Sequence, residues 1–262
     1  MILYNEFGGG RGMIKQVIPN NKWWVYGMSS ILLLVYQQVA SKIGGEIASL
    51  FDYRLIDKEN IFMWISVHHI VQMLIALLAI SLFGKLFKLD FGFKIGDYKS
   101  GCKYILIFTL IMMGYIIINY ILGYGVGAMN DYPYPLTLKN ILGTLGFQMF
   151  LSGPSEEILF RALPITILVW GSGKYTEIKV YKYKITVEVL IAAILFAMAH
   201  ITWSLVPASI GIDYFQLVYA FVLGYVYGKA FQKSKSVLYP MVMHSISNIA
   251  MVGMGYVFQW LM

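Results

Sequence analysis

Long apolar blocks are the feature that most restricts the fold of this chain. Seven of them can be drawn, at about 24–45, 61–83, 104–124, 137–170, 185–206, 211–231 and 236–262. A helix of about 20 apolar residues crosses the hydrocarbon core of a bilayer, which is about 30 Å thick, and satisfies its own backbone groups. Only 13% of the residues are charged, whereas a soluble domain has about 25%. The blocks therefore predict an all-α, polytopic membrane bundle.

The fourth block is too long for one simple span. Ser152-Gly153-Pro154 lies in its middle, where proline lacks the backbone N–H and its ring clashes with the preceding helical turn. Residues 137–151 are therefore expected to form a separate helix or a re-entrant segment before a helix over 155–170. The bundle then has seven or eight transmembrane helices. Because the chain has no internal repeat or long linker, residues 1–262 are predicted to form a single integral membrane domain.

Basic residues alternate between rich and sparse loops, which predicts the orientation of the bundle. Fifteen of the twenty precede the first block or follow the second, fourth and sixth blocks: Arg11, Lys15, Lys22, Lys85, Lys88, Lys94, Lys99, Lys103, Lys174, Lys179, Lys182, Lys184, Lys229, Lys233 and Lys235. The opposite side has only Lys42, Arg54, Lys58 and Lys139. Since Lys-rich and Arg-rich loops stay in the cytoplasm, we expect a multi-pass protein of the cell membrane with a cytoplasmic N-terminus. These loops explain the net charge of +7, so nucleic acid is not an expected partner.

The first apolar block is interpreted as a retained anchor, because it is longer than the apolar region of a signal peptide and no clean cleavage site follows it. Met13 is a candidate for the biological start, since the residues before it add nothing to a membrane core. Cys102 is the one cysteine of the chain, which excludes an intramolecular disulfide.

Ionisable side chains in the fourth block are the strongest sign of function, because a charge at membrane depth is costly unless it is paired or faces water. Ser155 is expected to cap a new helix, with Glu156 and Glu157 near the positive end of its dipole. Glu157 has the spacing to pair with Arg161, and Glu156 points about 100° away, free to face a cavity. An ion pair that fastens helices explains Glu157 but leaves Glu156 without a partner.

Two more polar pairs lie in later blocks. Phe196 and His200 are four residues apart and share a helix face, as do His244 and Asn248. Each pair alone suits an interhelical packing contact as well as a site. Counted at about 1.5 Å per residue from the predicted cytoplasmic ends, Glu156, His200 and His244 can lie in one layer of the bundle. A carboxylate, two imidazoles and a carboxamide brought together can activate water and stabilise an oxyanion.

The second block contains the adjacent histidines His68 and His69. Adjacent residues diverge on a helix, and no carboxylate lies near them in sequence. They are interpreted as packing or interfacial residues and left out of the predicted site. Trp203 is interpreted as an interfacial residue that can also line the cavity, since it follows His200 by three positions.

The motifs Glu156-Glu157-x-x-x-Arg161, Phe196-x-x-x-His200 and His244-x-x-x-Asn248, in this order on successive helices, resemble those of the CPBP intramembrane protease family. That family includes CAAX prenyl endopeptidases of the Ras-converting type and bacterial bacteriocin-processing or immunity proteins, also called Abi proteins. The resemblance places the motif-bearing core at about 137–262. The preceding residues match only as generic membrane helices.

The resemblance also implies catalytic roles. Glu156, assisted by His200, would deprotonate the attacking water, and His244 with Asn248 would stabilise the oxyanion of the tetrahedral intermediate. The family is called a metalloprotease family, but the motifs contain no H-E-x-x-H zinc site. A zinc ion held by Glu156, His200 and His244 therefore remains open beside a metal-independent, glutamate-activated water.

Glu157, Arg161 and Phe196 would support the site. The expected function is an intramembrane endopeptidase that hydrolyses a peptide bond in CAAX-type processing or in the maturation of a bacteriocin and self-immunity. Its partners would be a peptide or lipidated-protein substrate and membrane lipids. The alternative is a non-proteolytic immunity protein or transporter that uses the same polar cavity.

Overall fold

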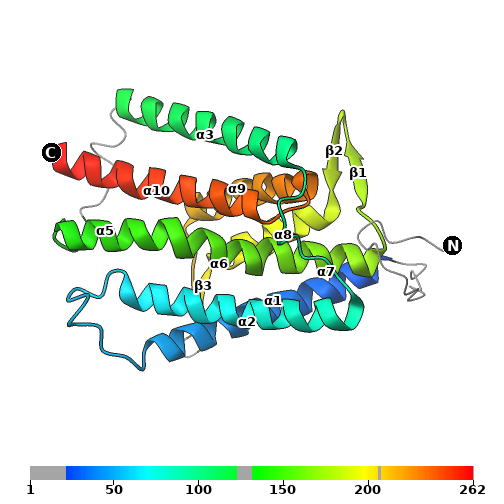
Figure 1. The fold of residues 1–262 in the computed structure, drawn as a ribbon, viewed down its shortest axis with the longest axis horizontal. Helices are drawn as coiled ribbons and strands as arrows, with labels where there is room; N and C mark the ends of the chain where they lie inside the picture. The colour runs from blue at the N-terminus through cyan, green and yellow to red at the C-terminus, as the bar shows by residue number, and fades with distance from the viewer. Residues whose placement is uncertain (1–21, 123–131, 206–207, 262) are drawn as a thin grey trace.

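The computed structural model describes residues 22–122, 132–205 and 208–261, and most of them are helical (Figure 1). Met13 and the first basic residues lie outside this part of the chain. The helical elements are α1 (Lys22–Ala48), α2 (Met63–Phe87), α3 (Tyr98–Ile121), α5 (Leu138–Phe147), η1 (Gln148–Ser152), α6 (Gly153–Glu157), η2 (Ile158–Ala162), α7 (Leu163–Ser172), α8 (Val187–Met198), α9 (Tyr214–Ser234) and α10 (Leu238–Leu261). Two antiparallel hairpins, β1 (Glu177–Val180) with β2 (Tyr183–Thr186) and β3 (Thr202–Leu205) with β4 (Ala208–Gly211), depart from the all-α prediction.

Three helices of the described residues are long and apolar enough to cross a membrane: Met63–Phe87, Tyr98–Ile121 and Leu238–Trp260. Leu74, Leu78 and Leu82 repeat every four residues along α2 and are each more than half exposed, as a lipid-facing stripe would be. A helical membrane protein is therefore supported. The count of seven or eight spans stays a prediction.

The predicted fifth block, 185–206, is wrong in its extent. Helix α8 ends at Met198 after 12 residues, and β3 begins at Thr202. The residues at this boundary, Ile201, Thr202 and Trp203, are β-branched or aromatic and favour an extended backbone over a helix. His200 consequently lies in the turn after α8 and not within the helix.

The expected break at Ser152-Gly153-Pro154 is wrong as well. The chain is helical without interruption from Leu138 to Ser172, seen as one long helix in Figure 1, with π-helical turns η1 and η2 on either side of α6. A π turn is wider than an α turn, so it moves the backbone away from the positions where the ring of Pro154 would clash. Ser155 does not cap a new helix, since its hydroxyl donates to the Ser152 carbonyl (3.1 Å).

Gly153 serves a close contact between helices. A Cβ at this position would lie 2.6 Å from Ser245 Oγ and 2.9 Å from Ser245 N of α10. Those distances are shorter than a side chain tolerates, so only glycine lets α10 approach α6 this closely. The residue that suggested a break in the sequence therefore brings the helices with the first and third motifs together.

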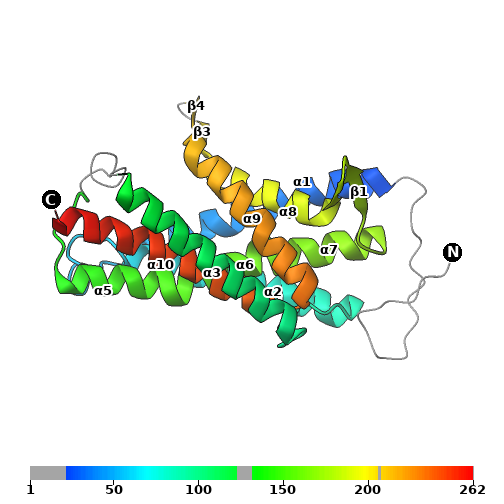
Figure 2. The ribbon, with the colours of Figure 1, turned by 90° about the horizontal axis from the view of Figure 1, so that it is seen from above.

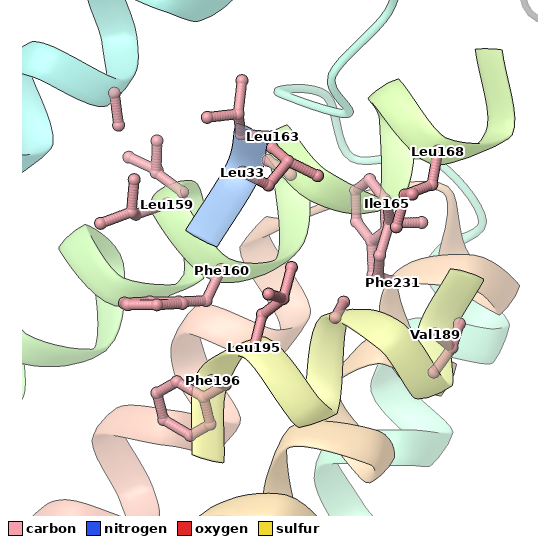
Figure 3. Packing of buried hydrophobic residues seen from close by; sticks show 14 of the residues in the cluster. Leu33, Leu159, Phe160, Leu163, Ile165, Leu168, Val189, Leu195, Phe196 and Phe231 are labelled. Carbon is pink, nitrogen blue, oxygen red and sulfur yellow. The ribbon is translucent and has the colours of Figure 1, made fainter. Parts of the chain in front are cut away.

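The hydrophobic core lies between α1, η2, α7, α8 and α9. Figure 3 shows Leu33, Phe160, Leu163, Leu195 and Phe231 converging from these five elements, and all five are buried. In water, the burial of each large apolar side chain contributes about 1.5–3 kcal/mol to the free energy of unfolding. In lipid, van der Waals packing between helices stabilises the fold instead. The core therefore packs η2 and α8, which carry residues of the first two motifs, against α1, α7 and α9.

The basic loops gather at one end of the bundle, near the start of α1 (Figures 1 and 2). The backbone N–H of Asp97 donates to the Ser234 carbonyl (2.7 Å), which joins the loop before α3 to the end of α9. Lys22 and Lys229 donate to Thr176 and Thr186, at the two ends of the β1–β2 hairpin (3.3 and 3.1 Å). This grouping is the one that the charge pattern predicted, while the side of the membrane on which it lies stays a prediction.

Glu188, in the first turn of α8, is a buried carboxylate at the same end that the sequence analysis did not single out. It accepts the backbone N–H of Thr176 with both oxygens (3.0 Å each) and hydrogen bonds from Tyr26 and from Ser172 (3.3 Å). These contacts join α1, α7 and α8. Glu188 therefore has a structural role that its partners satisfy.

Helix α3 offers a matched pair of glycines for a stability test. A Cβ at Gly101 would lie 2.4 Å from the ring of Tyr239 in α10, whereas a Cβ at Gly114 would meet nothing within 4 Å. Gly101→Ala should lower the stability by about 1–3 kcal/mol because it forces α3 and α10 apart. Gly114→Ala should be neutral or stabilising, since alanine favours helix. Thermal unfolding in detergent micelles measures both, and equal behaviour of the two variants would contradict the α3–α10 contact.

Cysteine labelling tests the predicted orientation. In a Cys102→Ala background, Tyr181→Cys places a thiol on the exposed tip of the β1–β2 hairpin, and Leu55→Cys places one in the loop at the other end of the bundle (86% and 97% exposed). If the basic end is cytoplasmic, an impermeant maleimide should label Leu55→Cys in intact cells and Tyr181→Cys only after permeabilisation. The opposite pattern would reverse the orientation.

Candidate functional site

The carboxylate of Glu156 lies between two imidazoles that come from different helices. Its Oε1 is 3.9 Å from Nδ1 of His69 in α2, and its Oε2 is 3.8 Å from Nε2 of His244 in α10. Ser152 also donates a hydrogen bond to Oε1 (3.3 Å). The structure thus brings together Glu156 and His244, as the motifs predicted, and adds His69.

Glu157 is fully buried and holds two partners at once. Its Oε2 is 3.1 Å from Nε of Arg161, which confirms the pairing predicted from the spacing. Its Oε1 accepts a hydrogen bond from Nδ1 of His244 (2.7 Å), a contact that the sequence did not predict. The guanidinium of Arg161 lies 3.9 Å from the centre of the Phe196 ring, so the first two motifs are in contact. Glu157 therefore orients His244 as well as neutralising Arg161.

The hydrogen bonds show that Nδ1 carries a proton in three histidines. A carboxylate only accepts, so Nδ1 of His244 carries the proton that Glu157 binds. His200 donates Nδ1–H to the Phe196 carbonyl (2.9 Å). The hydroxyl of Ser155 donates a hydrogen bond to the Ser152 carbonyl. The Ser155 oxygen therefore accepts a hydrogen bond from Nδ1–H of His69 (2.7 Å). In its neutral form, each ring then has a lone pair on Nε2, which can accept a proton or bind a metal.

A cavity of about 150 Å³ lies in front of Glu156. The motif-bearing side of this cavity is formed by Glu156, Phe160, Phe196, Ala199 and His200. The opposite side comes from α1 and α2 and is formed by Gln37, Gln38, Ser41, His68, His69 and Gln72. Of the expected catalytic residues, Glu156 and His200 therefore line the cavity together.

The other two expected catalytic residues lie behind Glu156. His244 and Asn248 are not among the residues that line the cavity. Asn248 donates from Nδ2 to Ser152 Oγ (2.9 Å), and Ser152 in turn donates to Glu156. In this conformation Asn248 thus helps to hold the carboxylate of Glu156.

His68 and His69 line the cavity, although the sequence analysis left them out of the site. His68 also packs as predicted, because its ring stacks on Trp64 (5.4 Å between centroids) and its Nδ1 faces Gly44 of α1. His69 contacts the site directly through Ser155 and Glu156. The signal for both was an ionisable pair at membrane depth, and the missing carboxylate partner was supplied by another helix.

Nothing in the described residues forms a ready metal site, since no three His, Cys, Asp or Glu side chains are arranged so that they can hold an ion. The Nε2 lone pairs around Glu156 are nevertheless the donor type that zinc takes. Zinc binding by Glu156, His200 and His244 therefore stays a prediction.

A family model described as type II CAAX prenyl endopeptidase Rce1-like matches residues 138–250, which include all three motifs. This region of the chain is similar to that family. The resemblance to the CPBP proteases is thereby confirmed, and the match supports a CAAX-type intramembrane protease. No curated protein and no solved structure matches the chain.

Replacement of the two glutamates should separate their roles. Glu157→Gln leaves Arg161 buried without its counter-charge and removes the carboxylate that orients His244. Breaking a buried pair costs about 3–5 kcal/mol, so the thermal unfolding temperature and the protein level should fall. Glu156→Gln keeps its volume and loses no close ion pair, so its unfolding should resemble that of the wild type. An unstable Glu156→Gln beside a stable Glu157→Gln would reverse this assignment.

Proposed function

We propose that this protein is an endopeptidase of the cell membrane that hydrolyses a peptide bond with a water activated by Glu156. The observation that carries the proposal is the placement of this carboxylate on a polar cavity, beside imidazoles of His69 and His200 whose Nδ1 protons are already bound. Such an arrangement provides proton acceptors for water, and within the described residues no Lys or Arg forms a salt bridge with Glu156 as it would with a structural glutamate.

In the proposed reaction, Glu156 takes a proton from water as the water oxygen bonds to the carbonyl carbon of the substrate. The C–N bond then breaks, and the leaving amine takes up the proton that Glu156 received. His69 and His200 hold the water in the cavity, and Glu157 keeps His244 oriented toward Glu156.

The assignment of His244 and Asn248 to the oxyanion needs a rearrangement. Asn248 would have to exchange its bond to Ser152 for the substrate oxygen, and His244 would have to donate from Nε2 as an imidazolium. If zinc is bound, it would polarise the water or the carbonyl group.

The substrate is proposed to be the C-terminal peptide of a lipidated protein. The Rce1-like match favours this CAAX-type processing over maturation of an unlipidated bacteriocin or other small peptide. Non-proteolytic immunity and transport are the alternative functions of the same cavity, and both would leave a bound peptide intact.

Cleavage assays test the proposal. Purified protein in nanodiscs is incubated with a farnesylated peptide ending in a CAAX sequence and with its unlipidated form, and products are read by mass spectrometry. Wild type should release the C-terminal fragment, and Glu156→Gln should be slower by at least about 10²-fold, the lower contribution of a positioned base. Full activity of a folded Glu156→Gln would refute the mechanism. Binding without cleavage by wild type would favour the immunity or transport alternative, and assays after removal of metal by a chelator test the zinc ion.

A further inference from the structure

The cavity wall opposite the motifs comes from helices that the Rce1-like match does not cover. Helices α1 and α2 precede residue 138, and they contribute three glutamines, Gln37, Gln38 and Gln72, to the lining. An uncharged amide is an unusual choice for a membrane helix unless it has a partner. The proton transfers of Glu156 do not explain why three glutamine side chains line this wall.

Two of the glutamines, Gln37 and Gln72, have amide groups whose hydrogen-bonding capacity is not filled within the described residues. The third, Gln38, accepts a hydrogen bond from Trp203 (3.3 Å). Gln37 is 2% exposed, and although Nε2 donates to the Leu159 carbonyl (3.3 Å), Oε1 has no partner among the described residues. Gln72 is 4% exposed and lines the cavity, and its amide makes no hydrogen bond within the described part of the protein. Buried amides with free donors and acceptors are normally matched by a ligand or ordered water.

The chemistry of this wall selects a peptide main chain. A side-chain amide both donates and accepts, and so does each peptide unit of an extended chain. A prenyl or acyl chain offers neither group, and a carboxylate would be matched by a cation, whereas the cavity lining contains neither Lys nor Arg. A volume of about 150 Å³ is below the roughly 300 Å³ of the smallest drug-sized pockets, so it suits one or two residues of chain.

We propose that Gln37 and Gln72 form a main-chain subsite, which holds the substrate residues next to the scissile bond in an extended conformation opposite Glu156. The inference rests on the proposed peptidase function and adds to it a means of recognition that does not read side chains. The substrate thus lies between a wall that binds its backbone, from α1 and α2, and a wall that carries the base, from α6.

Binding of N-methylated peptides tests this subsite. The probes are a fluorescent farnesylated CAAX peptide and a version with methylated amide nitrogens on both sides of the scissile bond. Affinities are measured in the Glu156→Gln background, where turnover does not interfere. Without further change, methylation should weaken binding by about 3- to 10-fold, the usual worth of a hydrogen bond. Adding Gln72→Leu should weaken the unmodified peptide to the same extent and abolish the effect of methylation.

Matched variants complete the experiment. Gln148→Leu makes the same change outside the cavity and should keep the full effect of methylation. Gln37→Met is the second subsite variant, used if Gln72→Leu unfolds at a lower temperature. The proposal is overturned if the effect of methylation persists in both subsite variants, or if folded protein does not bind the probe. A probe that binds through Gln72 but is not cleaved by wild type would refute the peptidase and leave the main-chain contact in place.

Discussion

The buried carboxylate of Glu157 is the contact on which the rest of the site depends. It neutralises the fully buried Arg161 and fixes the ring of His244, so one side chain joins α6, η2 and α10. Because Arg161 also lies against Phe196 of α8, removing the charge at Glu157 would loosen three helices at once. Glu156 can face the cavity because Glu157 makes these structural contacts with Arg161 and His244.

Much of the helical fold could be predicted because the apolar blocks are long and the chain has few ways to satisfy its backbone in lipid. The errors came where local rules competed with packing. Pro154 predicts a break in the helix, yet the helix continues because the π turns on either side of α6 make room for the proline ring. Gly153 is required because α10 approaches α6 closely at this position. The β3–β4 hairpin was missed because the apolar run through Trp203 is compatible with a helix or a strand.

The predicted contacts occur where residues four positions apart meet, as for Glu157 with Arg161 and Phe196 with His200. Contacts between helices far apart in sequence could not be predicted in this way. His69 reaches Glu156 from α2, and Asn248 binds Ser152 instead of facing the cavity. Nothing in the spacing of either residue specifies the rotation of its helix about the bundle axis.

The π turns around α6 have a consequence for how this helix can change over evolution. A π turn contains one residue more than an α turn, so η1 and η2 each shift the angular phase of the helix. The faces of α5 and α7 are therefore not in register with the face of α6 that bears the carboxylates. Substitutions can change the exposed face of α5 and the core contacts of α7 under separate constraints, while the short segment between the two turns sets the orientation of Glu156 and Glu157.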